Sequence, residues 1–371
     1  MTRLSAAAAE SYWDAVVAGD DRAAFDRLET ALREGVPLPQ VLRGMPLAAQ
    51  HRIGTLWEAD TWSVPQEHAA TAVSQQVLQR LLTRGPPADA DRGETVVVAC
   101  VEREWHSLPA LVLAVTLQHH GLHVDLLGAD TSVERLHARL TDAPVRAVLL
   151  SASLSSAIPA AHRHVEASRA HGVPVIAGGS AFDRDGVRAR AIGASAFAAS
   201  AEAVLEQLDR LPARVPPVQP LTGPGPAAAR RILHQERVVA ARLVHATRQL
   251  AARLDRRPGD EATPSWCGVL VDAAPYCVGA VAAACLTGDE GVLDELGGWA
   301  RRVLRPRAAP SGVHEAWWAA LAEAVRDTDA GDVAHRMVVD VGAAVASGTA
   351  DPEGKDRYPA PTDLDRPDVR D

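Results

Sequence analysis

Residues 95–106 have the sequence TVVVACVEREWH, and this stretch decides the fold class of the middle of the chain. Its first six residues are an apolar, β-branched run, which is typical of a parallel strand buried on both faces. Glu104 and His106 follow this run and precede an amphipathic segment at 108–119. The stretch therefore predicts a buried strand, then a loop that carries a carboxylate and an imidazole, then a helix.

Strand and helix patterns continue to alternate after this stretch. Strands are expected at 124–127, 145–151, 173–177 and 195–198, and helices at 108–119, 133–140, 157–171 and 201–211. Such alternation predicts a Rossmann-like parallel sheet with helices on both faces. Ligands of such sheets bind at the carboxyl ends of strands. His106, Ser151-Ala152-Ser153 and Gly178-Gly179 all fall at such ends.

The region before residue 83 has helical patterns only. Helices are expected at 6–18, 20–34 and 36–58, the last with an irregular start caused by prolines, and a fourth begins after Ser63. Ser63-x-x-Gln66 is a capping-box pattern, and Pro65 is tolerated in a first helical turn. Glu67 and His68 then occupy that first turn. Four helices with short connections predict an antiparallel bundle.

Two proline-rich linkers, at 84–93 and 212–226, divide the chain. A further helical block is expected after the second linker, with helices at 227–256, 273–286, 289–304, 312–326 and 331–346. The last 23 residues hold four prolines and seven acids, which predicts a disordered tail. The expected architecture is multidomain: a helical bundle at 1–83, a Rossmann-like α/β domain at 94–211, an all-α domain at 226–348 and a tail at 349–371.

The composition argues against several functions. A formal charge of −9 argues against a nucleic-acid-binding surface. Lys355 is the only lysine and lies in the tail, which argues against retinal or pyridoxal phosphate held as a Schiff base. The four cysteines form no zinc spacing, and Cys100 is expected to be a small buried residue. Because no signal peptide or membrane span is evident, we expect a cytoplasmic protein with no membrane partner.

Glu104 and His106 are suited to metal binding. An imidazole in a loop after a buried strand can ligate a metal through one nitrogen, while a carboxylate fixes the other nitrogen. Glu104 is close enough in sequence to be that carboxylate. The alternative is a loop histidine without a ligand.

The pattern resembles the cobalamin-binding module of methionine synthase, methylmalonyl mutases and corrinoid carriers. In that family an Asp-x-His-x-x-Gly motif supplies the lower ligand of cobalt, and this chain has Glu104-x-His106-x-x-Pro109. The resemblance assigns the cobalt to His106, with Glu104 as its partner. It also assigns four residues to the nucleotide tail, namely Ser151, Ser153, Gly178 and Gly179. Glu for Asp and Pro for Gly are departures from the motif, and Pro109 falls in a first helical turn, where proline is allowed.

Trp57, Val64, Glu67 and His68 resemble a second motif, the helical cap of the cobalamin-dependent photoreceptor repressors that control carotenoid synthesis. There the motif surrounds the 5′-deoxyadenosyl group of adenosylcobalamin, and light breaks the cobalt–carbon bond. The resemblance implies that Trp57 stacks over this group, that Glu67 contacts its sugar, and that His68 ligates cobalt after photolysis. The alternative is that Trp57 belongs to the bundle core and that Glu67 and His68 form an ordinary exposed turn.

Those repressors place a DNA-binding domain ahead of the cap, whereas here the bundle begins near residue 5. Together with the negative charge, this predicts no direct DNA binding. The output is then expected to run through an unknown downstream signalling partner or through homo-oligomers.

The C-terminal helical block suits a globin-like domain by size and helix content. A cobalamin module followed by such a domain resembles the photocobilins, which implies biliverdin as a second chromophore. Five residues are candidates for its pocket, namely Arg242, His245, Tyr276, His314 and Trp317. Each is alternatively a surface or packing residue. A thioether from Cys267, Cys277 or Cys285 is conceivable, but core burial is favoured.

These predictions combine into a photoreceptor that is not an enzyme. Adenosylcobalamin is expected between the helical cap and the Rossmann-like domain, with photolysis as the switch. Two alternatives are a corrinoid methyl carrier of a methyltransferase system and a cobalamin-sensing regulator that does not respond to light.

Overall fold

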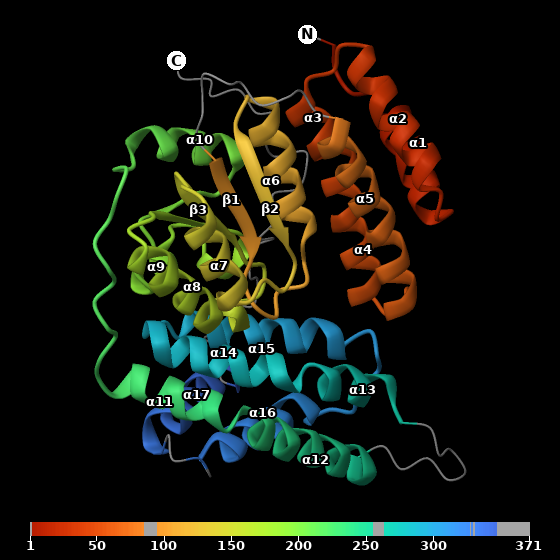
Figure 1. Ribbon diagram of the computed structural model, residues 1–371. Helices are drawn as coiled ribbons and strands as arrows, with labels where there is room; N and C mark the ends of the chain where they lie inside the picture. Colours follow the sequence, from red (N-terminus) through yellow and green to blue (C-terminus); the bar gives the residue numbers. More distant parts are fainter. Residues whose placement is uncertain (1, 85–94, 255–262, 327, 329–330, 347–371) are drawn as a thin grey trace, which may run out of the picture. The chain divides into compact units, whose positions relative to one another are not determined.

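The computed structural model describes residues 2–84, 95–254, 263–326, 328 and 331–346 (Figure 1). Contacts divide the chain into two compact units. The first comprises Met1–Glu94 and Ser107–Leu126, and the second comprises Thr95–His106 and Leu127–Pro352. The predicted tail at 349–371 and Lys355 lie outside the described residues. This division places most of the predicted α/β domain in one unit with the C-terminal block, but assigns residues 107–126, which include the helix expected at 108–119, to the N-terminal helical unit.

The first unit is helical, as predicted. It contains α1 (Ala6–Val17), α2 (Asp21–Arg33), α3 (Leu38–Leu42), the π-helical turn η1 (Arg43–Leu47), α4 (Ala48–Glu58), α5 (Val64–Arg84) and α6 (Leu108–His119). Ser5 and Asp20 cap α1 and α2, because each side chain accepts a hydrogen bond from an amide of the first turn. The expected irregularity of the third helix is the π-helical turn, which contains Pro46.

Two apolar clusters hold the helices of this unit together. The larger one joins α1, α2, α4 and α5 through buried residues that include Tyr12, Leu28, Ile53 and Val77. The smaller one packs α5 against α6 and includes Leu78. A bundle of amphipathic helices around a shared core is therefore confirmed.

The parallel sheet has the strand order β2-β1-β3-β4-β5. Its strands are β1 (Thr95–Cys100), β2 (His123–Gly128), β3 (Ala147–Ser151), β4 (Val175–Gly178) and β5 (Ala196–Phe197). In the register, Cys100 is opposite Ser151 and Ser151 is opposite Gly178. The carboxyl ends of β1, β3 and β4 are therefore neighbours, which brings the predicted motifs to one edge of the sheet.

Several helices cover this sheet. They are α7 (Val133–Asp142), α8 (Ile158–Ala170), α9 (Val187–Ala191) and α10 (Ala201–Arg210), with the 3-10 turns η3 (Ser155–Ala157) and η4 (Ser180–Phe182) after β3 and β4. The short helix α9 was absent from the prediction because five residues do not show a helical period. The Rossmann-like architecture is confirmed.

The C-terminal block is all-α, as predicted, but one expected helix is divided in two and one helix was not predicted. Its helices are α11 (Pro224–His234), α12 (Glu236–Leu254), α13 (Ser265–Asp272), α14 (Ala274–Thr287), α15 (Gly291–Leu304), α16 (Val313–Arg326) and α17 (Gly331–Ala346). The expected helix at 227–256 is two helices that break at Gln235. Helix α13 was not predicted.

Helix α14 is the centre of the block, and nearly every residue of it from Cys277 to Cys285 is buried. Cys267, Cys277 and Cys285 are all buried, so the prediction of core cysteines is confirmed. Burial raises the pKa of Cys277 to about 12, which keeps this thiol protonated and unreactive. One apolar cluster includes residues of the block and of the sheet, so the two share a core.

Within the described residues, no single helix has both the length and the apolar composition needed to cross a membrane, although the bent pair α13 and α14 meets those criteria together.

Candidate functional site

Glu104 and His106 form a hydrogen-bonded pair just after β1. Glu104 is only 1% exposed. One of its oxygens, Oε1, accepts hydrogen bonds from Nδ1 of His106 at 2.6 Å and from the His106 amide at 2.9 Å. The other, Oε2, accepts from the amides of Ser153 and Leu154 at 2.6 and 3.2 Å. Because Nδ1 faces a carboxylate, the lone pair of the neutral imidazole lies on Nε2.

This network sets the charge of Glu104. Burial opposes ionisation, but the hydrogen bonds that the carboxylate accepts from His106 and from the amide of Ser153 outweigh it and lower the pKa of Glu104 below its usual value. The carboxylate is therefore ionised and holds the imidazole in one orientation. This is the arrangement that carboxylate–histidine–metal sites use.

The loop that carries Glu104 and His106 is held by hydrogen bonds of its backbone, both within the loop and to Asp130. The amide of Glu104 donates to the carbonyl of Val101, and the carbonyl of Glu104 accepts from the amide of Asp130. Arg103 adopts a left-handed conformation with φ of 67°, and its amide donates to Oδ1 of Asp130 at 2.6 Å. The loop after β2 thus supports the loop after β1, a long-range contact that no local sequence pattern predicts.

The structure brings the other predicted motifs to the same edge of the sheet. Ser153 contacts Glu104 through its amide, and Oγ of Ser180 donates to the carbonyl of Ser153 at 2.7 Å. Ser151 is buried at the end of β3. These positions agree with a site at the carboxyl ends of β1, β3 and β4.

Contacts within the fold explain why residues 178 and 179 are glycines, and the sequence alone did not predict these contacts. A Cβ atom on Gly179 would lie 2.2 Å from the carbonyl oxygen of Ala152, and one on Gly178 would lie 2.8 Å from that of Ala198. Gly179 also has φ of 105° and ψ of 166°, a region that only glycine adopts readily. The protein's own backbone therefore requires both glycines before any ligand is considered.

The cap residues lie where α4 ends and α5 begins. Asp60, with φ of 55°, terminates α4, and the amides of Thr61 and Trp62 donate to the carbonyl of Leu56. This tight reversal leaves Trp57 on the last turn of α4, where it is partly buried. The reversal also starts α5 at Val64, so Trp57 and the first turn of α5 lie in one short segment.

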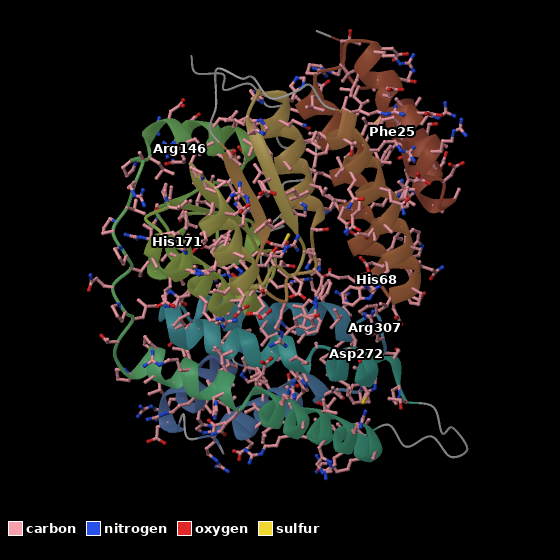
Figure 2. All side chains as sticks on the ribbon, in the orientation of Figure 1. Phe25, His68, Arg146, His171, Asp272 and Arg307 are labelled. Atoms are coloured by element: carbon pink, nitrogen blue, oxygen red, sulfur yellow. The ribbon has the colours of Figure 1, made fainter. Side chains whose placement is uncertain are left out.

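His68 lies in the first turn of α5 (Figure 2), where its Nδ1 contacts the carbonyl of Val64 at 2.8 Å. A carbonyl only accepts, so Nδ1 donates and the lone pair of the ring lies on Nε2. Glu67 accepts a hydrogen bond from Oγ1 of Thr71 at 3.1 Å. The His68 side chain is 73% exposed and Val64 is 47% exposed. These side chains are oriented locally and remain largely open to solvent.

The start of α5 is capped as the sequence suggested. The amide and the hydroxyl of Ser63 both donate to Oε1 of Gln66 at 2.9 Å. This is the half of the capping box in which the side chain at the third position reaches back to the cap.

The five bilin candidates lie on three helices and differ in exposure. Arg242 and His245 are exposed on α12, and Tyr276 is 44% exposed on α14. Trp317 is fully buried. His314 lines an apolar groove of about 280 Å³ whose other lining residues are Glu315, Trp318, Ala319, Ala322, Val339, Gly342 and Ala343. Of the five candidates, only His314 is among the residues that line this groove.

Comparisons with solved structures found remote likenesses. A monomethylamine corrinoid protein of Methanosarcina barkeri matches with a TM-score of 0.44 and 20% identity, over 55% of this chain and 99% of that one. A cobalamin-binding protein of Desulfitobacterium hafniense DCB-2 gives 0.29 and 18%, over 54% and 96%. The methanol:cobalamin methyltransferase complex MtaBC of Methanosarcina barkeri gives 0.29 and 16%, over 56% and 82%. No function is transferred at these values.

Among curated proteins, the HTH-type transcriptional repressor CarH of Myxococcus xanthus is 38% identical over 84 residues, which are 23% of this chain and 27% of the repressor. The chain thus matches about a quarter of that relative's length. This match corrects the expectation of no direct DNA binding. Physically, the net charge of a whole chain is an average and does not exclude a basic surface on one part of it.

Two family models match the parts of the chain that carry the site. Both are described as a B12 binding domain, and they cover residues 8–82 and residues 94–209. The first contains the cap residues and the second contains Glu104, His106 and the serine and glycine motifs. The chain therefore contains two regions that match B12 binding domains, one in the helical bundle and one in the α/β domain.

Proposed function

We propose that this chain is a light sensor that binds adenosylcobalamin, with His106 as the lower ligand of cobalt. The observation that carries the proposal is the Glu104–His106 pair, in which a buried carboxylate fixes Nδ1 of the imidazole. Nε2 is then the nitrogen that can ligate a metal. The two B12-binding domain matches support cobalamin as the group that holds this metal.

The proposal assigns the upper ligand of cobalamin to Trp57, Val64, Glu67 and His68. Bound adenosylcobalamin supplies a cobalt–carbon bond that light breaks. Trp57 and Val64 offer apolar surface to the adenosyl group, and Glu67 offers acceptors for sugar hydroxyls. His68, with its lone pair on Nε2, is suited to ligate cobalt once the adenosyl group has left.

Absorption spectra of the purified full chain test both parts. The chain is loaded with adenosylcobalamin in the dark and then illuminated, beside the variants His106→Ala, Trp57→Ala and His68→Ala. His119→Ala is the matched control, because His119 is an exposed histidine at the end of α6. We expect the control to behave like the unmodified chain.

Each variant has its own expected result. His106→Ala should shift the dark spectrum toward that of cobalamin without a histidine ligand. Trp57→Ala should weaken retention of the adenosyl form, and His68→Ala should change the spectrum only after illumination. If His106→Ala leaves the dark spectrum unchanged, the lower-ligand assignment is wrong. If both cap variants photoconvert like the unmodified chain, the upper assignment is wrong.

Two other functions remain to be separated from this one. A corrinoid methyl carrier would bind methylcobalamin and the adenosyl form about equally, and would transfer a methyl group with a partner enzyme. A cobalamin sensor without light response would give the same final state in the dark and after illumination. The set of Trp57, Val64, Glu67 and His68 favours the light sensor, because a carrier of a methyl group does not need residues that surround an adenosyl group.

The output of the sensor includes DNA among its candidate partners, since one relative is a transcriptional repressor. The test is retention of genomic DNA fragments by the loaded chain, compared in the dark and after illumination. Light-dependent retention would place the output at DNA, whereas equal background retention would direct the search to protein partners.

The proposal also keeps biliverdin as a second chromophore of the C-terminal block, with weaker support. The groove that His314 lines has a volume of about 280 Å³, slightly less than the ~300–1,000 Å³ typical of pockets that bury a ligand of drug size. Titration with biliverdin is the test, with His314→Ala as the variant. A red-absorbing complex that this variant weakens would support the bilin, and no complex would remove it.

A further inference from the structure

The C-terminal block is joined to the α/β domain by a buried charged cluster. Arg188 on α9 is 2% exposed. Its Nε donates to Oδ2 of Asp289 at 2.6 Å, and its Nη2 donates to Oε1 of Glu295 at 2.7 Å. Asp289 precedes α15 and Glu295 lies on it. A buried charge of this kind is costly when it loses its partners, so the cluster favours one arrangement of the two parts.

The same cluster contacts Ser155, which follows the two residues whose amides hold Glu104. Oγ of Ser155 donates to Oε2 of Glu295 at 2.8 Å and accepts from Nη1 of Arg188 at 3.2 Å. The two residues before Ser155 donate their amides to Glu104. Residues 153–155 thus contact the carboxylate that orients His106 at one end and helix α15 at the other.

Close packing of α14 against Ser156 restricts the 3-10 turn Ser155–Ala157. Gly279 on α14 lies so close to Ser156 that an added Cβ would be 2.9 Å from the Ser156 Cβ and 3.0 Å from its carbonyl oxygen. Such a contact leaves little room for the turn to move without α14.

A second contact joins the loop that carries Glu104 and His106 to the C-terminal block. Nη1 of Arg103 donates to both carboxylate oxygens of Glu236 at 2.5 and 2.6 Å. Glu236 is the first residue of α12, and Arg103 precedes Glu104. The C-terminal block therefore contacts both segments that surround Glu104.

We infer that the helical block of residues 224–346 positions the Glu104–His106 pair through Ser155, Arg188 and Glu295, so that cobalamin binding and the state of α14 and α15 are coupled. This inference rests on the proposed function for the identity of the ligand. Coupling between two sites is reciprocal. Binding at His106 should therefore stabilise α14 and α15, and loosening the cluster should weaken binding at His106.

The experiment is amide hydrogen exchange of the full chain with and without hydroxocobalamin, combined with absorbance titrations of affinity. Hydroxocobalamin is used so that neither an adenosyl group nor its photolysis contributes. The variants are Glu295→Gln and the milder Ser155→Ala, which keeps the Arg188 ion pairs. The matched control is Glu323→Gln, which removes an exposed ion pair with Arg326 within α16.

In the unmodified chain, hydroxocobalamin should slow exchange in the loop 101–106 and in α14 and α15. Ser155→Ala and Glu295→Gln should weaken binding by about 5-fold to 30-fold, within the range of typical couplings, and should abolish the slowing in α15. The control should change affinity by less than about 2-fold, as expected for an exposed pair.

The outcomes separate this inference from the proposed function. If the chain binds hydroxocobalamin and loop 101–106 is protected while α14 and α15 are not, the coupling is absent and only this inference fails. The same holds if both variants bind like the control. If the unmodified chain binds no cobalamin, the proposed function and the inference fail together.

Discussion

The two sets of proposed cobalamin residues are held in opposite ways. Glu104 is buried and accepts four N–H groups, two of them from residues about fifty positions away. His68 and Glu67 are held by contacts to residues within four positions on α5, and the side chains of Val64 and His68 are largely exposed. The proposed lower-ligand pair, Glu104 and His106, is therefore anchored in the folded core. The proposed upper-ligand residues instead form a surface that is oriented by one helix end. Stability should therefore depend on the first and ligand preference on the second.

The largest expected effect comes from Glu104→Ala. It leaves His106, Ser153 and Leu154 without their acceptor, and we expect it to lower the free energy of unfolding of the cobalamin-free chain by about 3 kcal/mol. Urea titration followed by circular dichroism measures this. The matched variant Glu67→Ala should cost less than about 1 kcal/mol, because Glu67 accepts from Thr71 at a partly exposed position. Equal losses for the two variants would contradict the contrast.

Gly179→Ala should have the next largest effect. The new Cβ meets the carbonyl of Ala152 in a backbone conformation that alanine avoids, so we expect a loss of about 2–3 kcal/mol of stability. Gly54→Ala in α4 is the control: its Cβ would meet nothing within 4 Å. That substitution should stabilise the chain by about 0.5–1 kcal/mol through helix propensity. If Gly179→Ala leaves the free energy of unfolding unchanged, the backbone at this edge of the sheet can shift to accommodate the added Cβ.

Trp57→Ala should change ligand preference more than stability. We expect the ratio of affinities for adenosylcobalamin and hydroxocobalamin to fall about 10-fold, which corresponds to about 1.4 kcal/mol. His106→Ala should weaken both affinities and leave the ratio unchanged. Equilibrium titrations in the dark measure these values, and a ratio that Trp57→Ala does not alter would remove the upper site from the proposal.

The smallest effect is expected for Ser63→Ala. The variant removes one of the two hydrogen bonds that Gln66 receives from Ser63, so we expect a loss of about 0.5–1 kcal/mol and a frayed first turn of α5. Amide exchange in residues 64–68 would detect this fraying. Exchange that stays as slow as in the unmodified chain would show that the tight reversal at Asp60, and not the cap, orients His68.

The sequence predicted the bundle, the α/β alternation and the Glu104–His106 pair, because these depend on local periodicity and on neighbours in the chain. It did not predict the break at Gln235, since neither glycine nor proline marks that boundary. The contact from Ser153 to Glu104 and the ion pair from Arg188 to Glu295 were also beyond it. The first contact joins residues about fifty positions apart, and the second joins residues more than one hundred positions apart. No local pattern in the sequence identifies such a distant partner.

The π-helical turn Arg43–Leu47 has a consequence for how the cap came to have its present geometry. A π-helical turn accommodates one residue more than an α-helical turn, and one residue rotates everything that follows by about 100° around the helix axis. Because α4 continues directly from this turn, Trp57 takes its direction from that extra residue. A chain whose turn at this place were α-helical, with one residue fewer, would present a tryptophan at the matching position to a different side of the helix. Helix phase, together with residue identity, therefore sets which side of α4 the tryptophan occupies.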